Sequence, residues 1–324
     1  MRVAANQLSR QVEEILRAWG MSAEHARITA ARLHHADIRG IDSHGVALLP
    51  LYAQLRAEGR IKFQPAIRVL RDSPVTALVD GDHGLGHVPS THAMQLAIDK
   101  CRQSGLAAVA VRNSNHFGAA GAYALMAAEA GLIGLAFTSV WNLSIVPTFA
   151  AEPMFGTNPI AFAAPGERHR VFYLDMATST VAIAKLRLAA LHGRPLEPGW
   201  ALDGTGHVTT DPGIALESRR LTPLGGTRPL GSHKGYGLAA MVEILCTMLA
   251  GAWYAATREA RHPGEQHVNI GHFFLAIDPK FFRAPGEFEH DLDHMIDALH
   301  ACRRADPGQP VWVAGDPEAQ AMEE

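Results

Sequence analysis

The sequence has few cysteines, only three among 324 residues, and its formal net charge is only −3. Cys101, Cys246 and Cys302 lie far apart, which excludes a CxxC metal or redox motif and indicates a reducing compartment, so we expect a cytoplasmic protein. The near-neutral charge provides no basic field for nucleic acid or an anionic membrane, so neither is expected as a partner.

Long hydrophobic runs are also missing. The most apolar stretch, GLAAMVEILCTMLAGAW (237–253), is interrupted by Glu243. It predicts a buried helix of a soluble protein, with Glu243 as a paired structural carboxylate. The N-terminal MRVAANQLSR has no apolar core, which excludes a signal peptide.

Strand-like and helix-like segments alternate through the middle of the chain. A helical pair is expected first, from Leu8 to Trp19 and from the capping Ser22 to Gly40. Helices are expected at 90–105 and 121–131, and strands at 75–81, 106–114, 132–139, 159–165 and 170–177. A further strand within 267–282 would close the sheet. This order predicts an α/β protein with a largely buried sheet.

The last helix, from Phe288, has a polar face on which a metal site could be imagined. Its members are His290, Asp293, His294 and Asp297. Without an HExxH or another fixed ligand set, a solvated helix face is the better interpretation, and no metal is expected.

The glycine-rich segments do not make a Rossmann fingerprint. GLGHVP (84–89) has Pro89 at the third glycine, and GYGLAA (235–240) does not follow a strand. Two helix starts can nevertheless bind an anion through free N–H groups, one at Gly118 and Gly121, the other beside Lys234. From spacing alone, the alternative that these glycines only permit close packing remains open.

His44 and His116 both follow small polar residues on predicted loops. A histidine titrates near pH ~6.5 and can transfer a proton at neutral pH. Among 18 histidines, however, a structural role is the commoner one for any single residue. Ser43 can orient His44, but no acidic third member or GxSxG elbow supports a hydrolase. These residues indicate a nucleotide- or anion-binding protein with candidate catalytic histidines.

Six segments in order resemble the type-2 malate/L-lactate dehydrogenase family, from about residue 8 to about residue 320. They are RGIDSHGV, NSNHFGAAGAYA, FGTNPIAFAAP, LDMATSTVAIAKL, GSHKGYGLAAMVEIL and NIGHFFLAIDP. That family also contains ureidoglycolate and sulfolactate dehydrogenases, a diketogulonate reductase and cyclic imino acid reductases.

The resemblance implies a non-Rossmann NAD(P)-binding fold with a mixed sheet, an N-terminal helical pair and C-terminal helices. It also implies a homodimer with active sites near the subunit contact. We expect three parts: residues 1–60 with the catalytic turn, the NAD(P)-binding core 61–280, and a C-terminal helix and cofactor-side tail at 281–324.

The same resemblance implies roles for individual residues. His44 would be the proton donor, oriented by Ser43, with Lys185 in the same relay and Thr157 touching substrate. His116 stands where some members have an acid–base histidine, so the two histidines compete for that role. The implied cofactor-binding residues are His116, Phe117, Gly118, Ala119, Ala120, Asp175, Met176, Ala177, His233, Lys234, Gly315 and Asp316.

Two departures from the family pattern bear on specificity. Many members have an arginine where this chain has Leu48, so binding of small diacids such as malate should weaken and a larger, more apolar 2-oxo acid should gain contact. Arg39 or a backbone N–H could replace the lost carboxylate donor. The turn at Gly315 and Asp316 also differs from the family's PGE type, and the chain is expected to be trimmed or to lack the last family element.

The expected function is therefore that of an NAD- or NADP-dependent oxidoreductase interconverting a 2-oxo acid and a 2-hydroxy acid. A reductase of piperideine- or pyrroline-2-carboxylate and a ureidoglycolate or sulfolactate dehydrogenase are alternatives, since each needs a hydride donor and one acid. A non-catalytic dinucleotide-binding relative that lost its carboxylate donor at position 48 is a third interpretation. The sequence does not choose between NAD and NADP.

Overall fold

The computed structural model describes residues 4–324. The first three residues of the N-terminal stretch, which we expect not to be a signal peptide, lie outside the described residues. The helices are α1 (Ala5–Ala18), α2 (Ala23–Asp37), α3 (Leu49–Ala57), α4 (His87–Ser104), α5 (Gly121–Glu129), α6 (Ile183–Leu191), α7 (Pro212–Ser218), α8 (Ser232–Glu243), α9 (Arg258–Arg261), α10 (Glu287–His300) and α11 (Asp316–Glu323). The strands are β1 (Arg68–Asp72), β2 (Thr76–Asp80), β3 (Leu106–Ser114), β4 (Ile133–Thr138), β5 (Ile160–Ala164), β6 (Phe172–Met176), β7 (Ala201–Leu202), β8 (Val208–Thr209), β9 (Arg220–Leu221) and β10 (Ile270–Ile277).

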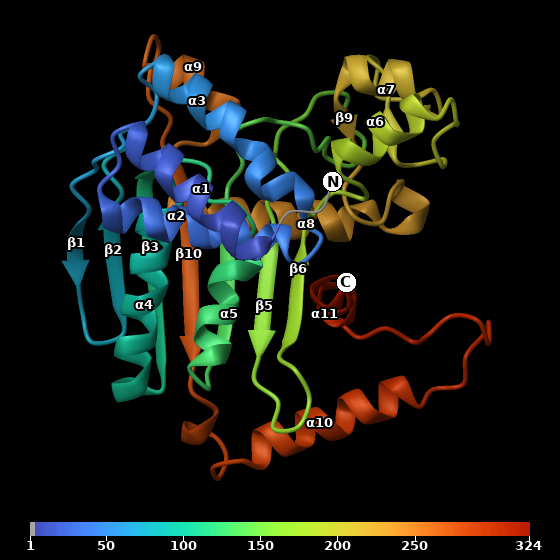
Figure 1. The fold of residues 1–324 in the computed structure, drawn as a ribbon. Coiled ribbons are helices and arrows are strands. Elements are labelled where there is room, and N and C mark those ends of the chain that lie inside the picture. The colour runs from blue at the N-terminus through green and yellow to red at the C-terminus, as the bar shows by residue number, and fades with distance from the viewer. Residues whose placement is uncertain (1–3) are drawn as a thin grey trace.

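A seven-stranded sheet forms the centre of the molecule, in the order β1-β2-β3-β10-β4-β5-β6 (Figure 1). Strands β2 and β3 run parallel, joined through α4, and the other neighbouring pairs are antiparallel. The predicted mixed, non-Rossmann α/β fold is thereby confirmed. The expectation that the segment 267–282 closes the sheet was wrong, because β10 lies at the centre, between β3 and β4.

Both faces of this sheet are covered, which explains its continuous apolar strands. Alternate side chains of a strand point to opposite faces. Phe274 and Ala136 belong to the main core beneath α4 and α5, whereas their chain neighbours Phe273 and Phe137 pack with Val242 of α8. A strand buried on both sides has no need of polar alternation.

The predicted N-terminal helical pair is present and covers one end of the strands (Figure 1). The Ser22 hydroxyl accepts the His25 N–H, as expected of a helix cap. Leu16 and Leu33 are fully buried and pack in one cluster with Tyr52 of α3. This cluster attaches the segment that follows α2 to the body of the protein.

A second, three-stranded sheet with the order β8-β7-β9 stands apart from the main one, together with α6 and α7 (Figure 1). The sequence predicted no helix or strand in this part of the chain. The small core of this lobe contains Leu186, Leu196 and Leu221, residues too widely spaced along the chain to make a periodic pattern. The division into three parts at residues 60 and 280 remains a prediction.

The long apolar helix is less buried than expected. It begins at Ser232 and continues into a π-helical turn, Ile244–Met248, which meets β10 where a Cβ at Gly271 would lie 1.6 Å from the Cys246 carbonyl oxygen. The opposite side of the helix exposes four large apolar side chains, Met241, Ile244, Met248 and Leu249. Within residues 4–324, no helix is both long enough and apolar enough to cross a membrane.

Glu243 lies at the junction of these two helical segments. It is 3% exposed, and its Oε2 accepts a hydrogen bond of 2.7 Å from the Asn158 amide. Burial raises the pKa of this carboxyl to about 7. Glu243 is therefore a structural carboxyl, as expected, but its partner is an amide and not a cation.

The polar face of α10 is not wholly solvated, so that prediction was wrong for Asp293. Its carboxylate is fully buried and accepts the backbone N–H groups of Glu167, Arg168 and His169 in the β5–β6 turn. The N–H groups of a turn have no partners on a neighbouring strand, and here the buried Asp293 carboxylate accepts their hydrogen bonds. His290 and His294 are exposed, and no set of three potential ligands for a metal occurs in residues 4–324.

Candidate active site

The stretch between α2 and α3 forms a tight turn, residues 41–48, made of two short 3-10 segments, Asp42–His44 and Val46–Leu48. Both carboxylate oxygens of Asp37 accept the Val46 N–H, at 3.1 and 3.0 Å. Gly45 lies over this carboxylate, since a Cβ there would be 1.7 Å from Asp37 Oδ1. Asp37 and Gly45 together fix the backbone that presents His44.

His44 is half-buried on this turn, with Ser43 exposed beside it. The Ser43 hydroxyl lies 2.8 Å from His44 Nδ1. Burial lowers the pKa of His44 below its usual 6.5. With Nδ1 engaged by the serine, Nε2 is the nitrogen left to exchange a proton with a ligand.

The structure brings His116 next to His44, although 72 positions separate them in the sequence. Their rings are stacked, with centroids 5.8 Å apart and an interplanar angle of 21°. Burial, with a smaller contribution from the charge of His44, lowers the pKa of His116 to about 3. Burial thus lowers the pKa of both histidines, and at neutral pH His116 stays uncharged.

Several buried polar residues lie near this histidine pair. His87 is fully buried at the start of α4, and neither of its ring nitrogens has a hydrogen-bond partner among residues 4–324. The Asn115 side-chain nitrogen is likewise buried without a partner in the described chain. His272 is satisfied by Thr138 and Ser114, at 2.7 and 2.8 Å. Orphaned buried donors are rare in folded proteins, and they favour a ligand or water in this region.

The predicted cofactor loop 116–120 packs directly against the turn at residues 41–48, which we call the Ser-His turn. A Cβ at Gly118, whose φ is +78°, would lie 2.9 Å from His87 Nε2 and 3.8 Å from the His44 carbonyl oxygen. Phe117 is 2% exposed and stacks on His272, and Ala119 and Ala120 are also buried. A bound molecule could therefore meet this loop mainly at the half-buried His116.

The two predicted anion-binding helix starts differ. At α5, the Asp175 carboxylate already accepts the Gly121 N–H at 2.7 Å, and burial raises the pKa of Asp175 to about 6. At α8, His233 and Lys234 are exposed in the first turn. The start of α8 therefore offers an exposed Lys234 to an anion, whereas a backbone N–H at the start of α5 already has a partner.

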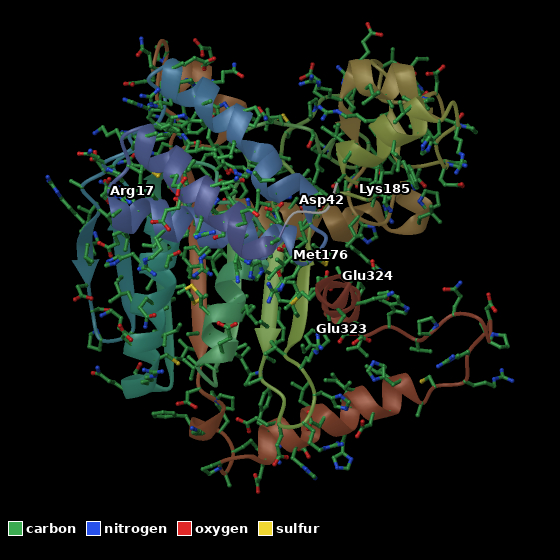
Figure 2. The ribbon with its side chains drawn as sticks, viewed as in Figure 1. Arg17, Asp42, Met176, Lys185, Glu323 and Glu324 are labelled. Atoms are coloured by element: carbon green, nitrogen blue, oxygen red, sulfur yellow. The ribbon has the colours of Figure 1, made fainter. Side chains whose placement is uncertain are left out.

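The remaining predicted residues make no direct contact with His44 in the described chain. Lys185 is exposed on α6, with its ammonium 5.6 Å from the centre of the Trp200 ring. Figure 2 labels Lys185 on α6, Asp42 on the turn after α2, and Met176 at the end of β6. The Thr157 carbonyl accepts both the N–H and the hydroxyl of Thr178, which places Thr157 beside the segment 175–177.

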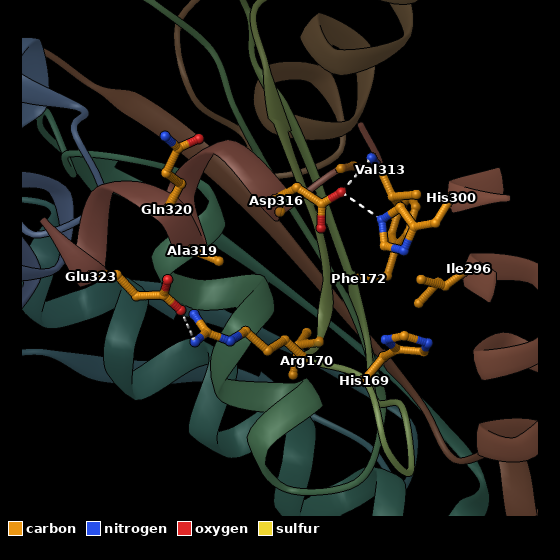
Figure 3. Close-up of a pocket in the computed structure, with 13 residues that line it drawn as sticks. His169, Arg170, Phe172, Ile296, His300, Val313, Asp316, Ala319, Gln320 and Glu323 are labelled. Carbon is orange, nitrogen blue, oxygen red and sulfur yellow. Dashed lines mark hydrogen bonds and ion pairs between the residues drawn. The ribbon is translucent and has the colours of Figure 1, made fainter. Parts of the chain in front are cut away.

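Gly315 and Asp316 lie at the start of α11, and they line a cavity of about 320 Å³ between β6, α10 and α11 (Figure 3). Asp316 Oδ2 accepts the Val313 N–H and lies 2.8 Å from His300 Nε2. Neither His44 nor His116 lines this cavity. A cofactor role for these two residues remains a prediction.

Leu48 is half-buried and packs on the N-terminal core cluster. Arg39, suggested above as a replacement donor, has its guanidinium 6.0 Å from the Tyr173 ring and donates to the His35 carbonyl. No contact joins Arg39 to Leu48 or His44 in the described residues. A backbone N–H is therefore the better of the two suggested carboxylate donors.

Sequence reasoning missed Asp37, Tyr52, His87 and Asn115. For Asp37 the sequence offered a signal. An acidic residue at the end of a helix can accept an N–H of the turn that follows, and Gly45 leaves room for its carboxylate. Tyr52 gave no signal, since an aromatic residue in a helix usually indicates core packing.

Proton transfer from a histidine beside a nicotinamide is the chemistry of hydroxy-acid dehydrogenases, and fold and site together point to that class. The chain belongs to the malate/L-lactate dehydrogenase family, whose model matches residues 3–324. This confirms the resemblance. The chain is accordingly an NAD(P)-dependent oxidoreductase that interconverts a 2-oxo acid and a 2-hydroxy acid.

Known relatives cover almost the whole chain. A malate dehydrogenase of Pyrococcus abyssi is 40% identical over 324 residues, which is 100% of this chain and 88% of the relative. An L-sulfolactate dehydrogenase of Methanocaldococcus jannaschii is 36% identical over 305 residues, 94% of this chain and 86% of the relative. The solved structure of the delta1-piperideine-2-carboxylate reductase from Pseudomonas syringae pvar. tomato has a TM-score of 0.87 at 30% identity, covering 100% of this chain and 93% of its own.

Proposed function

We propose that His44 is the proton donor in the reduction of a 2-oxo acid, and that the same residue accepts the proton when the 2-hydroxy acid is oxidised. The observation that supports this most is the 2.8 Å contact between Ser43 and His44 Nδ1 on a turn fixed by Asp37. As negative charge develops on the carbonyl oxygen, a positioned imidazolium can protonate it.

Bound NAD or NADP supplies the hydride. The buried Asn115 side-chain nitrogen, which has no partner in the described chain, and the exposed Lys234 in the first turn of α8 support such a dinucleotide. In this proposal the loop 116–120 and the segment 175–177 line the cofactor, and His233 and Lys234 bind its diphosphate. Ser43 holds the ring of His44, and Lys185 and Thr157 contact substrate or its proton relay.

The first test is the loss of NADH or NADPH absorbance with pyruvate, oxaloacetate, a bulky aryl or branched 2-oxo acid, and a cyclic imino acid. We expect turnover with the bulky 2-oxo acid and little with oxaloacetate, because the half-buried Leu48 offers apolar contact and no charge. Turnover of the imine alone would reject the 2-oxo acid as substrate and make the chain a cyclic imino acid reductase.

Leu48→Arg should raise kcat/KM for oxaloacetate roughly ten- to a hundredfold, mostly through KM, because a charge-assisted hydrogen bond contributes about 1.5–3 kcal/mol. The same change should lower kcat/KM for the bulky substrate. Leu48→Met, which conserves volume without adding charge, is the control and should leave the ratio of the two substrates within about threefold. Equal responses of both substrates to Leu48→Arg would contradict a specificity role.

We further propose that the chain forms a homodimer through the exposed side of α8 and the π-helical turn. Met241, Ile244, Met248 and Leu249 together make an apolar surface of a kind that mostly marks an interface. Light scattering should give about twice the chain mass of 34.9 kDa. Ile244→Glu should produce monomers. Phe282→Glu, at an exposed apolar site beyond the end of β10 (71% exposed against 56% for Ile244), should remain dimeric. A monomeric wild type would refute the dimer.

The cytoplasm is the location we propose, since Cys101, Cys246 and Cys302 are unpaired thiols.

A further inference from the structure

Tyr52 lies on α3, the helix that begins directly after the Ser-His turn, and its side chain is fully buried. Its hydroxyl is 2.9 Å from His116 Nδ1. The backbone N–H of Gly118 points at the same nitrogen from 3.3 Å. Two elements distant in sequence therefore converge on one atom of His116.

A backbone N–H can only donate, so the bond from Gly118 makes His116 Nδ1 an acceptor. Burial raises the pKa of the Tyr52 phenol well above its usual value, so the hydroxyl keeps its proton and can donate it to the same nitrogen. His116 Nδ1 must then carry the lone pair, and in a neutral imidazole the proton resides on the other nitrogen, Nε2.

The surroundings of Tyr52 leave its hydroxyl to His116. His87 meets the Tyr52 ring edge-on, with centroids 5.7 Å apart, and makes no hydrogen bond to it in the described chain. His44 does not contact Tyr52 but stacks on His116, and its charge lowers the pKa of His116. Tyr123 influences Tyr52 only electrostatically, since its own hydroxyl donates to the Phe117 carbonyl.

We propose that Tyr52 is a positioning residue that fixes His116 as the Nε2–H tautomer, so that His116 serves as a neutral hydrogen-bond donor to substrate and leaves proton transfer to His44. A neutral imidazole can polarise a carbonyl by donating a hydrogen bond without giving up its proton. This inference rests on the proposed role of His44, and it separates two histidines whose order along the chain says nothing about which is the acid.

The test is Tyr52→Phe, which removes one oxygen and keeps the buried ring. In ¹⁵N-labelled protein, the imidazole nitrogens of His116, assigned with a His116→Gln variant, report which nitrogen carries the proton. We expect the wild type to show the Nε2–H form alone and Tyr52→Phe to show a mixture containing the Nδ1–H form. Tyr123→Phe, a second fully buried tyrosine that loses a hydroxyl, should keep the wild-type tautomer.

Kinetics provide the second readout. Tyr52→Phe should lower kcat about three- to tenfold with a smaller change in KM, as expected from loss of one net hydrogen bond. An unchanged tautomer in Tyr52→Phe, an Nδ1–H form in the wild type, or a tautomer shift without a change in kcat would each overturn the proposal. Inactivity of the wild type on every 2-oxo acid and imine would instead reject the proposed function, while the tautomer comparison would still decide what Tyr52 does.

Discussion

We expect His44→Ala to lower the rate of 2-oxo acid reduction by about 10²- to 10⁴-fold, which is the typical contribution of a positioned general acid. The proton must then come from water, because His116 stays neutral and keeps its proton. Ser43→Ala should cost much less, since the imidazole remains and loses only one contact to Nδ1. Steady-state rates with a saturating nucleotide measure both effects.

The pH dependence distinguishes loss of an acid from loss of structure. Reduction requires protonated His44, so its kcat/KM should fall as the pH rises through a pKa that burial places below 6.5. Oxidation requires the neutral form, so its kcat/KM should rise over the same interval and then level off. His44→Ala should abolish both limbs. If His44→Ala keeps wild-type turnover while His116→Ala abolishes it, His116 is the acid.

Gly45→Ala is expected to lower turnover about 100-fold while the sheet remains folded. Its methyl carbon would lie 1.7 Å from Asp37 Oδ1 and 2.3 Å from the carboxyl carbon, so the carboxylate or the turn must move. Either movement breaks the bonds from the Val46 N–H, and an unpaired group of this kind costs about 1–3 kcal/mol. His44 would then leave the position in which it stacks on His116. The activity assay and a thermal melt report the two consequences separately.

The control for this change is Gly237→Ala, because a Cβ at Gly237 meets no atom within 4 Å. It should retain activity and stability. Asp37→Ala removes the obstacle as well as the acceptor, so adding Gly45→Ala to Asp37→Ala should cost far less than Gly45→Ala costs alone. Additive losses in the double variant would mean that the Asp37 carboxylate does not set the turn.

The sequence predicted those parts of the fold and site that depend on local patterns. Ser22 as a cap, the strands predicted at 159–165 and 170–177, and the catalytic turn each occupy a short stretch whose residue types suffice. Contacts between residues far apart in the sequence could not be predicted. Tyr52 meets His116 only because α3 packs against the loop after β3, and Asp293 is buried only because a distant turn folds over it.

The same limit explains the apolar helix. Composition predicted burial on all sides of residues 237–253, but it cannot show which side of a helix finds a partner within one chain. In the structure Val242 and Cys246 face the sheet, while Ile244 and Met248 face outward. The Pro and Gly pattern correctly excluded a Rossmann fingerprint. It could not show that the Asp175 carboxylate already accepts an N–H at the start of α5, which is why the proposed diphosphate site is at α8.

Because β10 lies at the centre of the sheet, the sheet can assemble fully only after residues 270–277 have been synthesised. Strands β1 to β3 and β4 to β6 emerge as two half-sheets, and the strand that joins them is made only at residues 270–277. Until then, β3 and β4 each present an unpaired edge, which is the kind of surface that recruits other chains. Both histidines of the pair are translated long before the strand that secures the loop behind them, so nascent chains that stall ahead of β10 should contain every predicted catalytic residue and still be inactive.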